Sequence, residues 1–151
     1  MKRWAMYVAL FVCCGLVLPA HAASCTIVSA SIAFGNYFPI SNATNDKTAI
    51  GSIQVQCDSA ATVTISLAVG MGTFQARAMS SGGNTLNYNL YADAGYQQTW
   101  GDGTSGTATV SYTFSAGGAH SLPVYGRVPK GQVDGAVGAY NATPQVTIAW
   151  P

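Results

Sequence analysis

The chain has 151 residues, of which only 7% are charged, and its formal net charge at pH 7 is +1. This charged share lies far below the roughly 25% of ordinary soluble domains, and the sequence contains no basic patch of the kind that neutralises phosphates. We therefore expect no nucleic-acid partner, and a surface with so few charges offers little repulsion against association with other proteins.

The start of the chain predicts a secretory signal peptide. Two basic residues at positions 2–3 precede an apolar run over residues 4–18, and Ala20-His21-Ala22 forms the small-residue ending at which such peptides are cleaved. The apolar run is shorter than the about 20 residues that a membrane-spanning helix needs. We expect cleavage after Ala22, so that residues 1–22 are the signal peptide and residues 23–151 form one exported domain.

Removal of the signal peptide would leave two of the four cysteines, Cys25 and Cys57. Two cysteines in an exported domain allow a single intramolecular pairing, so we predict a disulfide bond between them. The alternatives are a metal site and a reactive thiol, and neither has supporting His or Cys neighbours in the sequence.

From residue 25 onward, apolar residues alternate with polar ones, which is the period of a half-buried β-strand. Turn residues separate seven such segments, and no segment shows the period of a helix. One segment spans residues 121–128, and the inward-facing residues expected in the other six are Val28, Ala30, Ile32 and Phe34; Ile53, Val55 and Cys57; Val63, Ile65, Leu67 and Val69; Leu86, Tyr88 and Leu90; Val110, Tyr112 and Phe114; and Val146, Ile148 and Trp150. The pattern predicts an all-β antiparallel sandwich of about seven strands.

The segments between these strands are expected to be turns and loops, because they are rich in Gly, Ser, Asn and Pro. The longer ones cover residues 39–47, 70–84, 92–106 and 129–138.

The closing strand, expected over about residues 140–150, raises the question of what covers its edge. An edge strand exposes a row of unpaired N–H and C=O groups, which soluble proteins normally cover or blunt. Between Pro144 and Trp150 there is no Lys, Glu or Gly that would discourage pairing. Either another part of the chain or another molecule is expected to cover this edge.

Residues suited to catalysis are sparse. A nucleophile needs a base, glycoside hydrolysis needs paired carboxylates, and a metal needs clustered ligands. Beyond the signal peptide the chain has one His, His120, beside a Gly-Gly turn, and no Glu. The aspartates all fall on expected turns, at Asp46, Asp58, Asp93, Asp102 and Asp134. We therefore expect neither enzymatic activity nor a metal or other cofactor.

Several segments, taken in their order, resemble one known family. Cys25-Thr26 leads into them, and they lie at residues 33–37 (AFGNY), 86–93 (LNYNLYAD), 100–103 (WGDG), 122–129 (LPVYGRVP), 138–140 (GAY) and 146–148 (VTI). This ordered set is similar to the spore coat protein U-like domain family, which includes subunits of the archaic class of chaperone–usher pili. The resemblance covers essentially the whole chain after the signal peptide.

The resemblance implies an immunoglobulin-like sandwich that lacks its last strand and works as a structural subunit of a surface fibre or coat. Such a subunit exposes a groove that a periplasmic chaperone fills first and that a neighbouring subunit's N-terminal segment fills later, at the outer-membrane usher. Strand addition of this kind draws affinity from main-chain hydrogen bonds and specificity from side-chain pockets. The residues expected to line the groove are Val28, Ile32, Phe34, Val146, Ile148 and Trp150.

The N-terminus departs from the polymerising members of this family, which carry an alternating apolar stretch ahead of the first Cys. Only Ala23 and Ser24 would precede Cys25 after cleavage, so we expect a subunit that accepts a strand without giving one, at an end of its assembly. The alternative is a tip adhesin that binds glycans or surfaces. Its candidate binding residues are Tyr91, Tyr96 and Trp100, although aromatic residues near turns often plug the ends of sandwiches instead.

Overall fold

The computed structural model describes residues 22–140 and 144–151, and across these ranges it contains strands, turns and loops but no helix. The predicted all-β, antiparallel sandwich architecture is confirmed, since every strand ladder in the described part is antiparallel. The predicted signal peptide falls on residues 1–22, of which 1–21 lie outside the described residues, and it stays a prediction.

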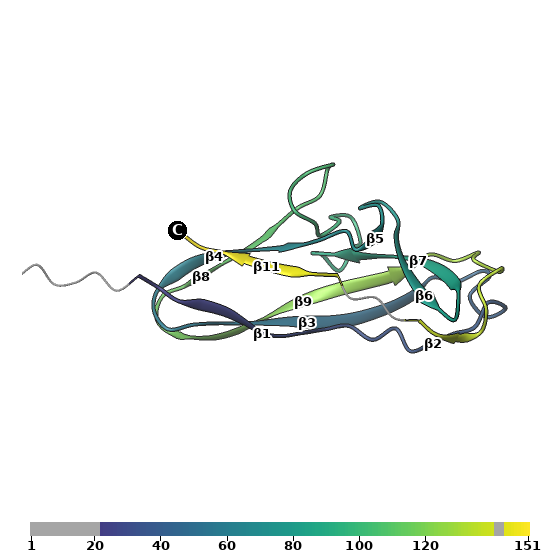
Figure 1. Cartoon of the computed structure of the whole chain (residues 1–151), viewed down its shortest axis with the longest axis horizontal. Helices are drawn as coiled ribbons and strands as arrows, with labels where there is room; N and C mark the ends of the chain where they lie inside the picture. Colours follow the sequence, from purple (N-terminus) through teal and green to yellow (C-terminus); the bar gives the residue numbers. More distant parts are fainter. Residues whose placement is uncertain (1–21, 141–143) are drawn as a thin grey trace, which may run out of the picture.

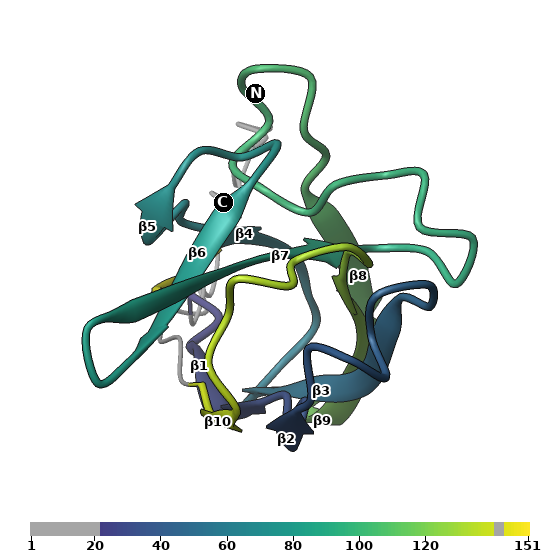
Figure 2. The same cartoon turned by 90° about the vertical axis from the view of Figure 1, so that its right-hand side faces the viewer.

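One sheet dominates the molecule, with six strands in the order β1-β3-β9-β7-β6-β5. Their bounds are β1 Cys25–Ser31, β3 Lys47–Cys57, β9 Gly118–Val128, β7 Asn84–Tyr91, β6 Arg77–Ser81 and β5 Met71–Gly72. Figure 2 shows this sheet curling around the molecule like part of a barrel.

A second sheet has the order β11-β4-β8, with β11 at Val146–Ala149, β4 at Ala61–Leu67 and β8 at Val110–Phe114. A small ladder pairs β10 (Gly138–Ala139) with β2 (Asn36–Tyr37) at one end of the long axis (Figure 1). The core lies between the two larger sheets and includes Val55 of β3, Ile65 of β4, Leu90 of β7 and the loop residue Trp100.

The predicted disulfide between Cys25 and Cys57 is present. The two cysteines lie directly opposite each other in the β1–β3 ladder, with 4.1 Å between their Cα atoms. Both are buried, so the bond joins the first strand to the core at the end of the domain where the described chain begins.

The prediction of a loop over residues 70–84 is wrong, because this stretch contains β5 and β6. Strand β6 turns Arg77 and Met79 inward, and a buried arginine hides the apolar alternation that marks a strand. Gly82 and Gly83 form the two-residue turn into β7, with φ angles of 54° and 87°. Two successive positive φ values are the geometry that a tight hairpin of this kind requires.

Several other strands differ in length from the prediction, including β1, which ends at Ser31 before Phe34, and β9, which begins at Gly118 before residue 121. Strand β3 begins at Lys47, well before Ile53, because it pairs with β9 along its whole length. The closing strand is shorter than expected and covers only Val146–Ala149, while Gly138 and Ala139 pair with β2 instead. Pairing partners, which the local sequence does not reveal, set these boundaries.

Candidate functional site in the groove between two sheet edges

The candidate site lies where the outer edges of the two larger sheets run beside each other. Strand β1 ends one sheet and pairs with β3, and β11 ends the other and pairs with β4. The two strands are neighbours in space, but within the described ranges no strand pairs with either of these outer edges. We call the space between the outer edges of β1 and β11, which holds no strand of the described residues, the gap.

One end of the gap is closed by the side chain of Trp150. Its indole N–H donates a hydrogen bond to the carbonyl of Ala23 across 2.8 Å, which joins the end of β11 to the residue just before β1. At the other end Pro144, which leads into β11, lines two hollows instead.

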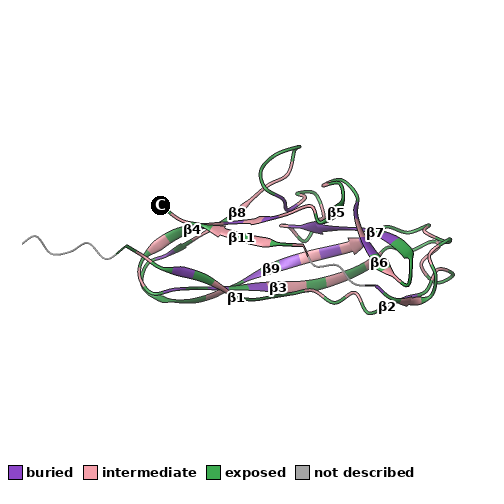
Figure 3. Ribbon diagram, in the orientation of Figure 1, coloured by how far each residue is buried: buried purple, intermediate pink, exposed green. Residues whose placement is uncertain are grey.

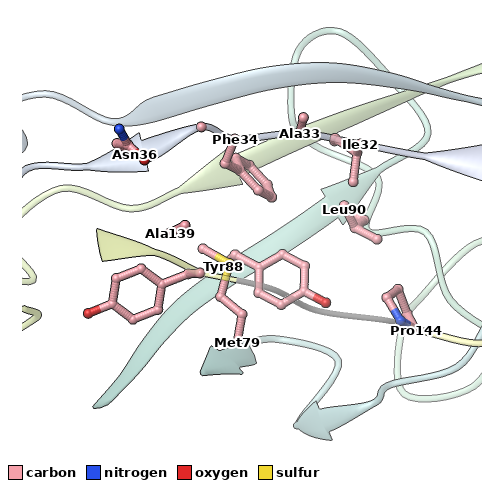
Figure 4. A pocket seen from close by; sticks show the side chains of 11 residues that line it. Ile32, Ala33, Phe34, Asn36, Met79, Tyr88, Leu90, Ala139 and Pro144 are labelled. Atoms are coloured by element: carbon pink, nitrogen blue, oxygen red, sulfur yellow. The ribbon is translucent and has the colours of Figure 1, made fainter. Parts of the chain in front are cut away.

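The two hollows have volumes of about 270 and 280 Å³, and they share Ile32, Leu90 and Pro144 as lining residues. The one nearer the centre is also lined by Ala30, Ile53, Leu67, Val124 and Val146. The one nearer β2 and β10, drawn in Figure 4, is lined in addition by Phe34, Met79, Tyr88, Ala139 and Tyr140. Because they share walls, we treat them as one continuous feature and call it the groove.

Small residues in the large sheet make room for the wall of the groove. A Cβ atom on Gly126 of β9 would lie 2.5 Å from Cδ1 of Ile32 and 2.5 Å from Cζ of Phe34. One on Gly51 of β3 would lie 2.6 Å from Cβ of Ile32. The segment after β1 therefore lies across a part of the sheet that carries no side chains. Phe34 is held there by an edge-to-face contact with Tyr88, with 5.8 Å between the ring centroids.

The chemistry of the groove suits an extended apolar segment. No charged side chain of the described residues lines either hollow. The floor comes from core residues such as Leu67 and Leu90, and the rims carry strand edges with backbone groups available for pairing. Apolar side chains can enter such a groove while the backbone that carries them completes a ladder. In Figure 3, β11 shows the matching pattern of half-buried and exposed residues, with none fully buried.

The six residues expected in the groove separate into three groups. Ile32, Phe34 and Val146 line the hollows. Ile148 and Trp150 are half-buried against the core next to the closed end. Val28 is 52% exposed and lines neither hollow.

A β-bulge explains the position of Val28. Ile27 pairs with Val55 and Ser29 with Gln54, so Val28 is the extra residue on β1. A bulge of this kind reverses which residues face the core. Cys25 and Ile27 face inward before it, and Ala30 and Ile32 do so after it. The lining residues that sequence reasoning missed come from several strands, for example Leu67 of β4, Leu90 of β7 and Met79 of β6. Met79 lies in the stretch predicted to be a loop.

The structure does not support Tyr91, Tyr96 and Trp100 as a binding platform. Trp100 is fully buried, and its indole N–H donates to the carbonyl of Ile65 across 3.0 Å, so its ring joins the two sheets. Tyr91 is only 7% exposed and stacks edge-to-face on Tyr96. The guanidinium of Arg127 lies over both tyrosine rings, at 5.2 and 5.4 Å from their centroids. These aromatic residues therefore hold a loop onto the sheet.

Arg77 organises the neighbouring region from inside the core. Its side chain is fully buried and donates to the carbonyls of Ala68 and Trp100 and to Oδ1 of Asn89. Asn89 in turn donates to the carbonyl of Phe74, so the network ties three segments together. Burial lowers the pKa of the Arg77 guanidinium below its ordinary value, since the charged form loses hydration. The arrangement is a structural one, because these donors and acceptors satisfy one another.

Groups suited to other chemistry are dispersed. In the part of the chain that the structure describes, no three His, Cys, Asp or Glu side chains gather as they would around a metal ion. His120 lies within β9, where its ring stacks on Tyr112 with 3.6 Å between centroids, and not at a turn as expected. The described residues also include no helical segment that is long and apolar enough to span a bilayer.

Comparison with known proteins identifies the family of the chain. A search of curated proteins finds no match to this chain. The profile of the Spore Coat Protein U domain, in contrast, matches residues 13–147, which is nearly the whole chain. This domain is typical of structural subunits of surface pili and coats, which associate with other components of those assemblies outside the cell. The chain belongs to the Spore Coat Protein U domain family.

Proposed function

We propose that this protein is a structural subunit that accepts a strand from a partner, and that the groove between β1 and β11 is where the strand binds. The observation that carries the proposal is a pair of joined hollows, one lined by residues of both β1 and β11 and the other continuing beside residues 32–36. A periplasmic chaperone would supply the strand first, and a neighbouring subunit would replace it at the outer-membrane usher.

The size of the groove sets the expected gain in stability. Fully burying one large apolar side chain contributes about 1.5–3 kcal/mol, so three or four anchors would contribute roughly 5–12 kcal/mol. A domain of this size has only about 5–15 kcal/mol of net stability. We therefore expect the free domain to be marginal, and a bound strand to raise its melting temperature strongly.

The test uses synthetic peptides of about twelve residues that alternate Val with Thr, which is long enough to follow the groove as an extended strand. Binding is measured by calorimetry and by the shift in melting temperature of the exported protein. A peptide of the same composition, rearranged so that the apolar residues no longer alternate, is the control for nonspecific binding.

Two variants locate the bound peptide. Ile32→Asp places a charge on a wall shared by both hollows, and we expect binding to be lost. Val28→Asp, on the same segment but pointing outward at the bulge, is expected to keep the affinity within about twofold. Equal loss in both variants, or a peptide that binds no better than its rearranged control, would contradict the proposal.

A further inference from the structure

The outer face of the large sheet carries an arginine beside aromatic and aliphatic side chains. Tyr125 and Arg127 lie two positions apart on β9, so they share one face of the sheet, whereas Gly126 between them faces the groove. Directly opposite on β3 lie Ile50, which pairs with Tyr125, and Thr48, which pairs with Arg127. Ile50 is 72% exposed, and Tyr125 and Arg127 are half-buried between buried neighbours on β9 (Figure 3). We call Thr48, Ile50, Tyr125 and Arg127 the outer patch.

Two tyrosine rings hold the guanidinium of Arg127 in place. It lies 5.2 Å from the ring centroid of Tyr91 and 5.4 Å from that of Tyr96, within the range of cation–π attraction. Its Nη2 donates a hydrogen bond to the hydroxyl of Tyr91 across 3.1 Å. Tyr96 has a φ of 55°, in the left-handed region that bulky residues rarely occupy, so the loop keeps this ring over the guanidinium despite a conformational cost. The position of Arg127 is therefore fixed before any ligand arrives.

Most of the hydrogen-bonding capacity of Arg127 stays unused. A guanidinium has five N–H donors, and in the described part of the chain only Nη2 has a hydrogen-bond partner. Oδ2 of Asp46 lies 3.8 Å from Nε, which is buried, while Nη1 is accessible. Asp46 thus offsets part of the charge from the Nε side and leaves the edge formed by Nη1 and Nη2 open. Such an edge is the fork that binds a carboxylate through two parallel hydrogen bonds.

We propose that the outer patch binds an acidic polysaccharide, with a sugar carboxylate on Nη1 and Nη2 of Arg127 and a sugar ring on Tyr125 and Ile50. The open guanidinium edge selects an anionic ligand by charge complementarity. A sugar ring presents C–H groups on its faces and hydroxyls at its edge, which matches apolar side chains bordered by the hydroxyl of Thr48. The inference goes beyond the proposed function and does not depend on it, because the outer patch and the groove lie on opposite faces of the sheet.

An acidic peptide fits the outer patch less well than an acidic polysaccharide. At Tyr125 and Arg127 the backbone of β9 is paired on both sides, with β3 and with β7. An extended peptide therefore finds no free strand edge to pair with at these two residues. A polysaccharide needs none, because it makes its contacts through hydroxyls, ring faces and carboxylates. Members of this family work outside the cell, where polysaccharides of cell surfaces are accessible to them.

The experiment uses trigalacturonic acid, a short chain of uronic-acid sugars, as the probe. Its methyl ester is the matched control, since it has the same rings without the negative charges. Sodium acetate, added as a competitor, supplies a carboxylate without a sugar ring. Binding to the exported protein is measured by calorimetry, with and without the alternating Val/Thr peptide. The variants are Arg127→Gln, Arg127→Lys and Tyr125→Ser, with the exposed Lys130→Gln as a charge-matched control, and a thermal melt shows that each is folded.

We expect the acid to bind and its ester to bind at least about tenfold more weakly, because the charge-assisted hydrogen bonds are lost. Arg127→Gln should lower the affinity by a similar factor, and Lys130→Gln should stay within about twofold. Arg127→Lys keeps the charge but loses the fork, so it should also weaken binding, and it makes the same test if Arg127→Gln does not fold. Tyr125→Ser should weaken the binding of acid and ester alike, since both stack on its ring. The Val/Thr peptide should leave the affinity for the acid unchanged.

Three results would overturn the inference: no binding of the acid, equal affinity for acid and ester, and equal affinity of the Arg127 variants and Lys130→Gln. Competition by acetate at the same carboxylate concentration would indicate a simple anion site and would overturn the assignment to a polysaccharide. None of these results bears on the groove. Failure of the Val/Thr peptide to bind would remove the proposed function and leave this inference intact.

Discussion

Gly126 offers a sharp test of how the groove is built, since it makes room for two of the residues that line it. In Gly126→Ala, the new Cβ would lie 2.5 Å from both Cδ1 of Ile32 and Cζ of Phe34. Both atoms are the far ends of side chains, so they can move, and the free volume nearest to them is the groove that they line. The substitution should therefore fill part of the groove without disrupting the sheet.

Its effect on stability should be small. Overpacking costs typically about 1–3 kcal/mol, and replacing Gly by Ala recovers about 0.4–1 kcal/mol by restricting the unfolded chain. The expected net loss in unfolding free energy is about 0–2.6 kcal/mol. Peptide binding should suffer more, because one lost pocket is worth about 1.5–3 kcal/mol, which corresponds to a loss of about 10- to 150-fold in affinity.

Gly118→Ala is the matched control, because it lies on the same strand and a Cβ there would meet open space among the described residues. Unfolding by denaturant gives the stability of each variant, and calorimetric titration with the alternating peptide gives its affinity. If Gly126→Ala folds and binds the peptide as tightly as Gly118→Ala, then Ile32 and Phe34 do not line the binding site.

Three further predictions concern stability and processing. Arg77→Met should lower the unfolding free energy by about 3–5 kcal/mol, because the carbonyls of Ala68 and Trp100 lose their buried partner. In the control variant Lys130→Met, whose side chain is exposed, the unfolding free energy should change by no more than about 0.5 kcal/mol. Comparable denaturation midpoints for the two variants would count against the role of Arg77. The intact mass of exported protein should show that it begins at Ala23, and its thiols should become alkylatable only after reduction. Replacing both cysteines by Ser should lower the unfolding free energy by roughly 3.5–4 kcal/mol for a sequence separation of 32. Free thiols in the unreduced protein would argue against the disulfide bond. Hydrogen bonds from the amides of Gln98 and Gln97 lower the pKa of Asp93 in the folded protein, so the carboxylate's contribution to stability is complete above its ordinary pKa of 3.8 and is lost as the pH falls through the folded pKa. The melting temperatures of wild type and Asp93→Asn should therefore converge as the pH is lowered through that value. A difference in melting temperature that does not change with pH would contradict the role of these hydrogen bonds.

The sequence by itself determined the class of fold and the family. Alternating residues such as Val63, Ile65 and Leu67 predict β-strands because side chains of a strand point to opposite faces, a purely local property. The disulfide was also predictable, since two cysteines in an exported domain allow one pairing.

The tertiary structure decided the strand boundaries and which residues line the groove. A bulge that turns Val28 outward and a buried Arg77 within a strand depend on pairing with distant segments, so no local pattern reports them. Trp100 shows the same limit, because an aromatic residue among turn residues looks the same in sequence whether it faces solvent or a core. Here the carbonyl of Ile65, 35 positions away, accepts its N–H and places the ring inside. The groove depends most on tertiary structure, since its two walls come from opposite ends of the chain and only the packing of two sheets brings them together.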